Sequence, residues 1–165
     1  MITLSEGGLN DADDNNAGVD AQQIVYPGVY TCITVTGVLA DGRLVGAHLA
    51  RMWSADKLAR GMARMRVLAG GSEFLSIYIV GMLTKSWSPA MFARQYDYGT
   101  GQLAQLVRAG LGNVTCNGWA YDTSAHDTVE VSASKVGTGT AGAFIDITPS
   151  GLGSQFIRPH EFARI

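Results

Sequence analysis

The stretch GVYTCITVTGVLADGRLVGAHLA, residues 28–50, predicts two strands joined by a tight turn. Its β-branched and apolar residues favour strands, and the Asp41–Gly42 pair between them is typical of a hairpin turn. Cys32 opens the first strand and His48 lies late in the second. Because successive side chains of a strand point to opposite faces, the pairing register decides whether these two can meet.

The apolar pattern distinguishes two registers of this hairpin. A two-residue loop at Asp41–Gly42 would separate Cys32 and His48 by the sheet and place the imidazole among apolar side chains, at a cost of about 1–3 kcal/mol if it had no partner. A three-residue loop, Ala40–Gly42 with a left-handed Gly42, instead gives one nearly apolar face. We therefore predict the three-residue loop, with Cys32 and His48 as diagonal neighbours about 5–8 Å apart at Cβ.

The remaining chain predicts an α+β fold, with mixed, mostly antiparallel sheets in a sandwich-like core and two or three flanking helices. Apolar runs rich in β-branched residues indicate the strands, and apolar residues at helical spacing indicate the helices. The expected strands are 22–26, 29–40, 44–52, 73–83, 113–122, 127–136 and 142–150, and the expected helices are 54–69, 88–99 and 101–112. Residues 73–83 are apolar over enough of their length to predict a central strand that is covered on both faces.

Composition predicts one domain over residues 23–165, preceded by a flexible, acidic and Gly/Asn-rich segment over residues 1–22. A net charge of −2 gives no bulk basic field, so we expect neither nucleic acid nor a membrane as partner, and a monomer. The N-terminus lacks the charged-then-apolar order of a signal peptide, which argues against classical secretion. A specialised secretion route, or a domain from a longer protein, stays open.

A thiol beside an imidazole is a candidate nucleophile with its base. An adjacent imidazolium stabilises the thiolate and lowers the thiol pKa from its usual value of about 8.5. The same histidine can then hand its proton to a leaving amine. Backbone N–H groups near the start of the Cys32 strand are candidates to hold an oxyanion. Catalysis by Cys32 and His48 requires a shared face and a thiol that is open to solvent, whereas a sealed Cys32 would be a small buried hydrophobe.

The arrangement resembles the glutamine deamidases of the chemotaxis-receptor deamidase fold, a group that includes the cytotoxic necrotizing factor catalytic domain and Burkholderia lethal factor. The matching pieces are YTCITV (30–35) and LVGAHLA (44–50). The resemblance implies hydrolysis of a glutamine side chain to glutamate on a protein substrate, through a thioester and without a metal or organic cofactor. It also implies a third group that orients the histidine, for which a backbone carbonyl near Tyr26 and the hydroxyl of Thr34 are the candidates.

The function expected on this basis is a bacterial protein-glutamine deamidase that acts as a toxin or effector. It would be secreted by a non-classical route or delivered into a target-cell cytosol, with a cytoplasmic location as the alternative. Two other functions stay open: a non-catalytic protein-binding module on the same scaffold, and a cysteine peptidase. Papain-like peptidases fit less well, because they place the cysteine on a helix and the histidine far downstream.

The other chemistry-bearing residues have plainer interpretations. Cys116 is expected in the core, His126 in a loop and His160 on the surface. A metal site is not expected, because no Cys or His pair has ligand spacing. Trp119 is expected to be a core or rim aromatic residue.

Overall fold

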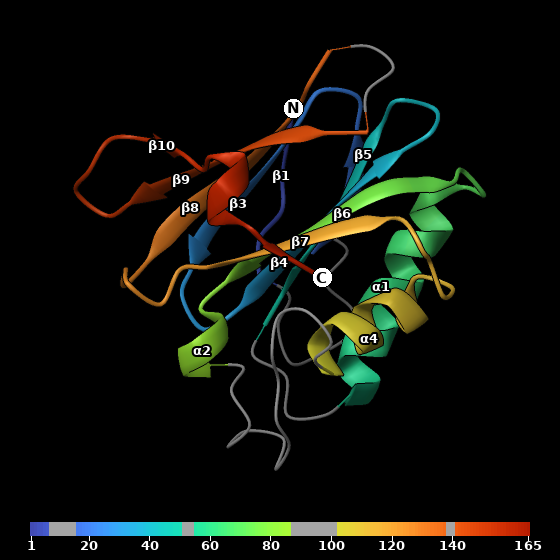
Figure 1. Ribbon diagram of the computed structural model, residues 1–165, viewed down its shortest axis with the longest axis horizontal. Coiled ribbons are helices and arrows are strands. Elements are labelled where there is room, and N and C mark those ends of the chain that lie inside the picture. The colour runs from blue at the N-terminus through green and yellow to red at the C-terminus, as the bar shows by residue number, and fades with distance from the viewer. Residues whose placement is uncertain (7–15, 51–54, 87–101, 138–140) are drawn as a thin grey trace.

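The computed structural model describes residues 1–6, 16–50, 55–86, 102–137 and 141–165. Over these residues it contains two β-sheets with eleven strands, and three α-helices (Figure 1). Every strand pair is antiparallel except β1–β3 and β6–β7, within the described part of the chain. The predicted α+β class with mixed, mostly antiparallel sheets is therefore confirmed.

The elements follow the chain in this order. The strands before the middle of the chain are β1 (Ile2–Thr3), β2 (Ala17–Asp20), β3 (Gln23–Val29), β4 (Ile33–Leu39), β5 (Leu44–Leu49) and β6 (Phe74–Gly81). The later strands are β7 (Asn117–Asp122), β8 (Val129–Lys135), β9 (Ala143–Pro149), β10 (Gln155–Phe156) and β11 (Ala163–Arg164). The helices are α1 (Ala55–Ala69), α2 (Leu83–Ser86) and α4 (Gln102–Gly110), with a 3-10 helix, η1 (Pro159–Glu161).

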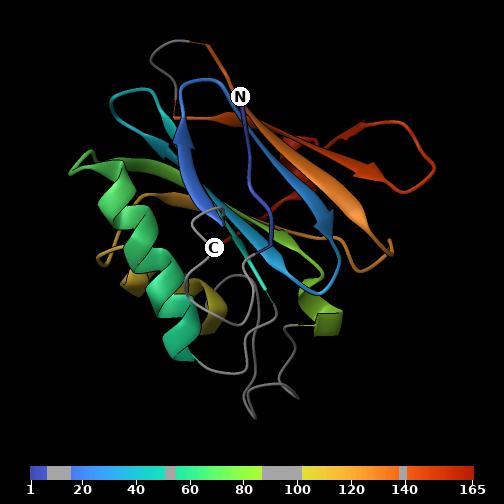
Figure 2. The ribbon, with the colours of Figure 1, turned by 180° about the vertical axis from the view of Figure 1, so that it is seen from behind.

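The fold has three layers. The six-stranded sheet, in the order β11-β7-β6-β4-β5-β2, is the middle layer. The helices α1 and α4 cover one of its faces, as Figure 2 shows for α1. The five-stranded sheet, in the order β1-β3-β8-β9-β10, packs on the other face. The middle sheet is thus buried on both sides, which explains the predominantly apolar sequences of β4 and β6.

Helix α1 shows how the sequence specifies the helical layer. Leu58, Met62 and Met65 recur at helical spacing and are all buried against the middle sheet. Gly70 and Gly71 follow with φ values of 65° and 85°, a left-handed conformation that ends the helix at little cost for glycine. The predicted end of this helix is confirmed.

The hairpin of β4 and β5 adopts the predicted register. Ile33 pairs with Leu49, and Thr34 pairs with His48. Leu39 N donates to Arg43 O at 2.9 Å, which closes a three-residue loop that contains Gly42 at φ 84°. The left-handed Gly42 allows the three-residue loop, and this loop length decides which face of the sheet each side chain of β5 points to.

The N-terminal segment contains two short strands that were not expected. β1 pairs in parallel with β3, and β2 pairs with β5 at the edge of the middle sheet. These strands are only two and four residues long, so their apolar pattern is too short to stand out from a polar composition. Residues 7–15 lie outside the described part of the chain, and the boundary at residues 22–23 stays a prediction.

Two predictions for elements later in the chain have other outcomes. The strand expected to reach residue 83 ends at Gly81, because α2 begins at Leu83. The Asp122 carboxylate accepts from Leu83 N at 2.8 Å and so satisfies a free donor at the start of this short helix. The helix expected over 88–99 lies outside the described residues.

Candidate active site

The hairpin brings Cys32 and His48 into direct contact. Cys32 immediately precedes β4, and its Sγ lies 3.0 Å from His48 Nε2 on β5. Both residues lie on the face of the middle sheet that packs against the five-stranded sheet. The prediction that they share a face is confirmed, and the contact is within the range of a sulfur–nitrogen hydrogen bond.

The second nitrogen of the imidazole is held by the N-terminal segment. His48 Nδ1 lies 2.9 Å from Leu4 O. A carbonyl oxygen only accepts hydrogen bonds, so Nδ1 carries a proton and donates it. In the neutral ring, Nε2 is then left with a lone pair, and the S–H of Cys32 donates to it. We call Cys32 Sγ, the His48 imidazole and Leu4 O the relay. In the relay, the thiol is placed as a nucleophile, the imidazole as its base and the carbonyl oxygen as the acceptor that orients the base.

The backbone on both sides of this carbonyl is fixed. Leu4 N donates to Val25 O at 2.8 Å, and the Leu4 side chain is buried between the sheets. On the other side of the histidine, His48 N donates to Asn16 O at 2.7 Å. Residues next to β1 and β2 therefore hold His48 at two points, which sequence reasoning did not predict.

The two predicted candidates for the orienting group have other partners. The Thr34 hydroxyl donates to Val80 O at 3.1 Å. The Tyr26 hydroxyl shares a 2.6 Å hydrogen bond with the Thr36 hydroxyl. Leu4 O holds the position at Nδ1 that was expected for a carbonyl near Tyr26 or for Thr34. A backbone acceptor carries no residue identity, which is why sequence reasoning did not find it.

Tyr26 nonetheless contacts the histidine through its ring. The Tyr26 and His48 rings meet edge to face, with centroids 6.0 Å apart and an interplanar angle of 87°. Burial raises the pKa of Tyr26, opposed by its hydrogen bond with Thr36, so the phenol stays protonated. Gly46 makes room for it, because a Cβ at that position would overlap the Tyr26 hydroxyl oxygen. Tyr26 is therefore a wall of the candidate site that packs on the imidazole.

The surroundings of the pair favour its neutral form. Burial raises the pKa of the Cys32 thiol to about 11; a backbone hydrogen bond at Tyr30 opposes the rise, and the nearby Glu6 carboxylate adds to it. Burial also lowers the pKa of His48, against the opposing effect of the Leu4 carbonyl. At neutral pH the closed site therefore holds a thiol and a neutral imidazole.

The structure shows this site in a closed state. Cys32 is 1% exposed and His48 is 0% exposed. The contact between Cys32 and His48 that catalysis requires is present, but the Cys32 thiol is not open to solvent. A substrate can reach Sγ only after the residues that cover it have moved.

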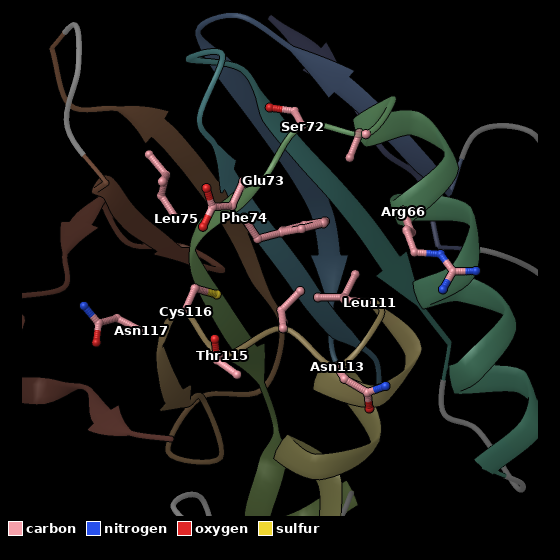
Figure 3. Close-up of a pocket in the computed structure, with 13 residues that line it drawn as sticks. Arg66, Ser72, Glu73, Phe74, Leu75, Leu111, Asn113, Thr115, Cys116 and Asn117 are labelled. Atoms are coloured by element: carbon pink, nitrogen blue, oxygen red, sulfur yellow. The ribbon is translucent and has the colours of Figure 1, made fainter.

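A cavity of about 610 Å³ lies elsewhere, between the end of α1, the start of β6 and the loop after α4 (Figure 3). Its wall includes Phe74, which pairs with Leu39, whereas the neighbour of Cys32, Ile33, pairs with Gly81 at the other end of β6. At about 3.3 Å per residue the two ends of β6 are about 23 Å apart. Cys116 lines this cavity and is half-buried rather than sealed in the core, so the two cysteines belong to separate environments.

The other two histidines lie on elements that contain no residue of the relay. His126 lies in the turn between β7 and β8, where its N–H donates to Thr123 O at 2.8 Å, and His160 is exposed on η1. Among the described residues, no group of three or more His, Cys, Asp or Glu side chains is placed to hold a metal ion.

Comparison with known proteins adds no family assignment. No protein-family model matches the chain, and no curated protein matches it in sequence. Over the described residues, no helix combines the length and the apolar character needed to span a membrane. The function must therefore be inferred from the chemistry of the relay.

Proposed function

We propose that the protein is a thiol-dependent amidohydrolase that deamidates glutamine side chains of a protein substrate. One observation carries the proposal: Cys32 Sγ lies 3.0 Å from His48 Nε2, while His48 Nδ1 lies 2.9 Å from the Leu4 carbonyl oxygen. A nucleophile, a base in contact with it and an acceptor that fixes the tautomer of the base are the parts that covalent amide hydrolysis requires.

The proposed reaction has two halves. In the first, His48 takes the thiol proton, the thiolate attacks the glutamine side-chain carbonyl carbon, and a C–S bond forms. The C–N bond then breaks, and the imidazolium returns its proton to the nitrogen, which leaves as ammonia. In the second half, His48 takes a proton from water while the water oxygen attacks the thioester carbon. The C–S bond breaks, the thiolate regains a proton from His48, and glutamate is released.

Catalysis requires the closed site to open. With Cys32 1% exposed and its thiol pKa raised to about 11 by burial, the observed state keeps the proton on sulfur. Entry of water or a polar amide raises the local dielectric, which favours transfer of that proton to the imidazole. The proposal thus assigns the closed state to the resting protein and the ion pair to the substrate-bound protein.

Glutamine, rather than another amide, is proposed from the resemblance of residues 30–35 and 44–50 to the deamidase toxins. The same resemblance supports a bacterial toxin or effector that acts alone on a protein of a target cell, in the cytosol of that cell or after non-classical secretion. A main-chain peptide bond as substrate would instead make the protein a peptidase.

A second candidate is a non-catalytic protein-binding module, and the burial of Cys32 favours it. A thiol that is 1% exposed and bonded to a neutral histidine is also a satisfied pair in a core. In that case the relay would stabilise the packing of β1 and β5, and no thiolate would form at neutral pH.

Substrate capture tests the proposal. A Cys32→Ser protein is used to isolate bound proteins from a lysate, and each captured protein is then treated with the wild-type protein and analysed by mass spectrometry. The proposal expects replacement of one glutamine amide by a carboxylate, by the wild type and by a Cys116→Ser control but not by His48→Ala. An unchanged mass supports the binding module, and a cleaved chain supports the peptidase.

A further inference from the structure

A second cavity, of about 260 Å³, lies between the five-stranded sheet, the C-terminal segment and the β6–β7 part of the middle sheet. The C-terminal segment, red in Figure 1, crosses here from the five-stranded sheet to the edge of the middle sheet. Five aromatic side chains line the cavity: Tyr78, Trp119, Phe144, Phe156 and Phe162. None of the residues of the relay contributes to it, so it is a separate feature of the fold.

The aromatic rings form a largely buried wall and an exposed rim. The Tyr78 and Trp119 rings stack at 5.2 Å with an interplanar angle of 22°, and Phe162 meets Tyr78 edge on at 5.7 Å. Phe144 and Phe156 also meet edge on, and they are 47% and 46% exposed, in contrast to Tyr78 at 7%. The cavity therefore has a wall of largely buried aromatic side chains and an apolar rim that is open to solvent.

The aromatic wall also offers one hydrogen-bond donor. Tyr78 is more than nine-tenths buried, and its hydroxyl oxygen accepts from Ala143 N at 3.2 Å, at the wall of the cavity. Among the described residues, no acceptor takes the proton of this hydroxyl. A buried phenol can donate a hydrogen bond as well as accept one, so this hydroxyl can donate to an acceptor on a ligand in the cavity.

We propose that this cavity, the aromatic pocket, binds a small, neutral, planar aromatic molecule that carries a hydrogen-bond acceptor. Among the described residues, no charged side chain lines the pocket, which disfavours an ionic ligand. A cavity of about 150 Å³ is enough for benzene, so 260 Å³ accommodates one bicyclic ring system and little more. A flat ligand would pack against this aromatic wall and accept the Tyr78 proton at its edge.

Titration with quinoline and indole tests the proposal. The two are bicyclic and similar in size, but only quinoline has a ring-nitrogen acceptor. Isothermal titration and the NMR signal of the Trp119 indole N–H are followed on the whole chain. We expect saturable binding of quinoline with a dissociation constant below about 1 mM, as a ligand of this size allows. Absence of saturation by both compounds would overturn the proposal.

Variants assign the binding to the aromatic pocket. Tyr78→Phe keeps the stacked ring and should weaken quinoline binding about five-fold, the effect of one hydrogen bond, while indole binding stays unchanged. Phe156→Ala at the rim should weaken both compounds, whereas Leu152→Ala, another exposed apolar residue outside the pocket, should weaken neither. Equal affinities for quinoline in all variants, or self-association of the free protein through this face in sedimentation, would contradict the assignment.

Discussion

The two faces of the β4–β5 hairpin are equally buried but chemically opposite. Toward the helices, residues such as Ile33, Val35 and Leu49 form an apolar surface that packs on α1. Toward the five-stranded sheet, the same strands present the thiol of Cys32 and the imidazole of His48, both almost fully buried. Burial without partners is costly for polar groups, and each of these has one. One face of the hairpin holds the fold together, and the other holds a chemical arrangement that packing alone does not require.

The largest expected effect is on the polar face. Cys32→Ser and His48→Ala should each lower glutamine deamidation of the captured substrate by about 10⁴-fold, because each removes a reacting group of the relay. Initial rates measured by mass spectrometry check this, with folding verified by circular dichroism. Cys116→Ser, which changes the cysteine at the remote cavity, should keep the wild-type rate. A folded Cys32→Ser protein that still deamidates would exclude Cys32 as the nucleophile.

Substitutions on the apolar face of the hairpin should instead change the stability of the protein. Leu49→Ala should lower the free energy of unfolding by about 2–5 kcal/mol, because it leaves a cavity against α1. Urea unfolding measures the change. Val67→Ala on the exposed side of α1, where Val67 is 76% exposed, should stay within about 0.5 kcal/mol of the wild type. Equal losses in the two variants would contradict the assignment of this face to the core.

The fit between Gly46 and Tyr26 links the hairpin to the five-stranded sheet. Gly46→Ala should cost about 1–3 kcal/mol of unfolding free energy, because the new Cβ overlaps the Tyr26 hydroxyl. Tyr26→Phe removes that oxygen, so the double variant should lose less than the sum of the two single losses. Additive losses in urea unfolding would show that the overlap is not the cause.

Tyr26→Phe alone should cost about 1 kcal/mol, since it gives up the hydrogen bond with Thr36 but keeps the ring against His48. The matched control is Tyr30→Phe, because Tyr30 is 49% exposed and should change stability little. Thermal unfolding of both variants gives the comparison. A larger loss for Tyr30→Phe than for Tyr26→Phe would be the contrary result.

The smallest effect is a dependence of stability on pH. Burial lowers the pKa of His48 below its ordinary value of 6.5. As pH falls through 6.5, the unfolded chain therefore takes up a proton that the folded protein does not, and the free energy of unfolding decreases. The contribution is fully present above pH 6.5 and is lost on acidification. Urea unfolding at several pH values should show this slope in the wild type but a smaller one in His48→Gln; equal slopes would contradict it.

The hairpin shows how far sequence reasoning reaches. Its register followed from a two-residue apolar period and a single glycine, because a shift by one residue would have placed the His48 imidazole among apolar side chains. That register also predicted that Cys32 and His48 lie on the same face, close enough to touch. The Leu4 carbonyl could not be predicted in the same way, since an acceptor on the backbone is available in any residue and its position depends on a parallel pairing with β3, distant in sequence.

The aromatic pocket is a second feature that could not be predicted from the sequence. Its lining comes from β6, β7, β9, β10 and the C-terminal segment, so no short motif contains it. Trp119 was expected only as a core or rim aromatic residue. Its stacking on Tyr78 depends on the parallel pairing of β6 with β7, which joins segments about forty residues apart in the sequence.

The alkylation rate of Cys32 tests most directly whether the relay is reactive. In a Cys116→Ser background, the native protein is treated with iodoacetamide near neutral pH, and the modified fraction is followed by intact mass. If the buried pair opens and ionises, Cys32 should react without global unfolding, and His48→Ala should slow the reaction by about ten-fold or more. A thiol that reacts only when the protein unfolds, or one that His48→Ala makes faster, would mean that the relay is a structural pair.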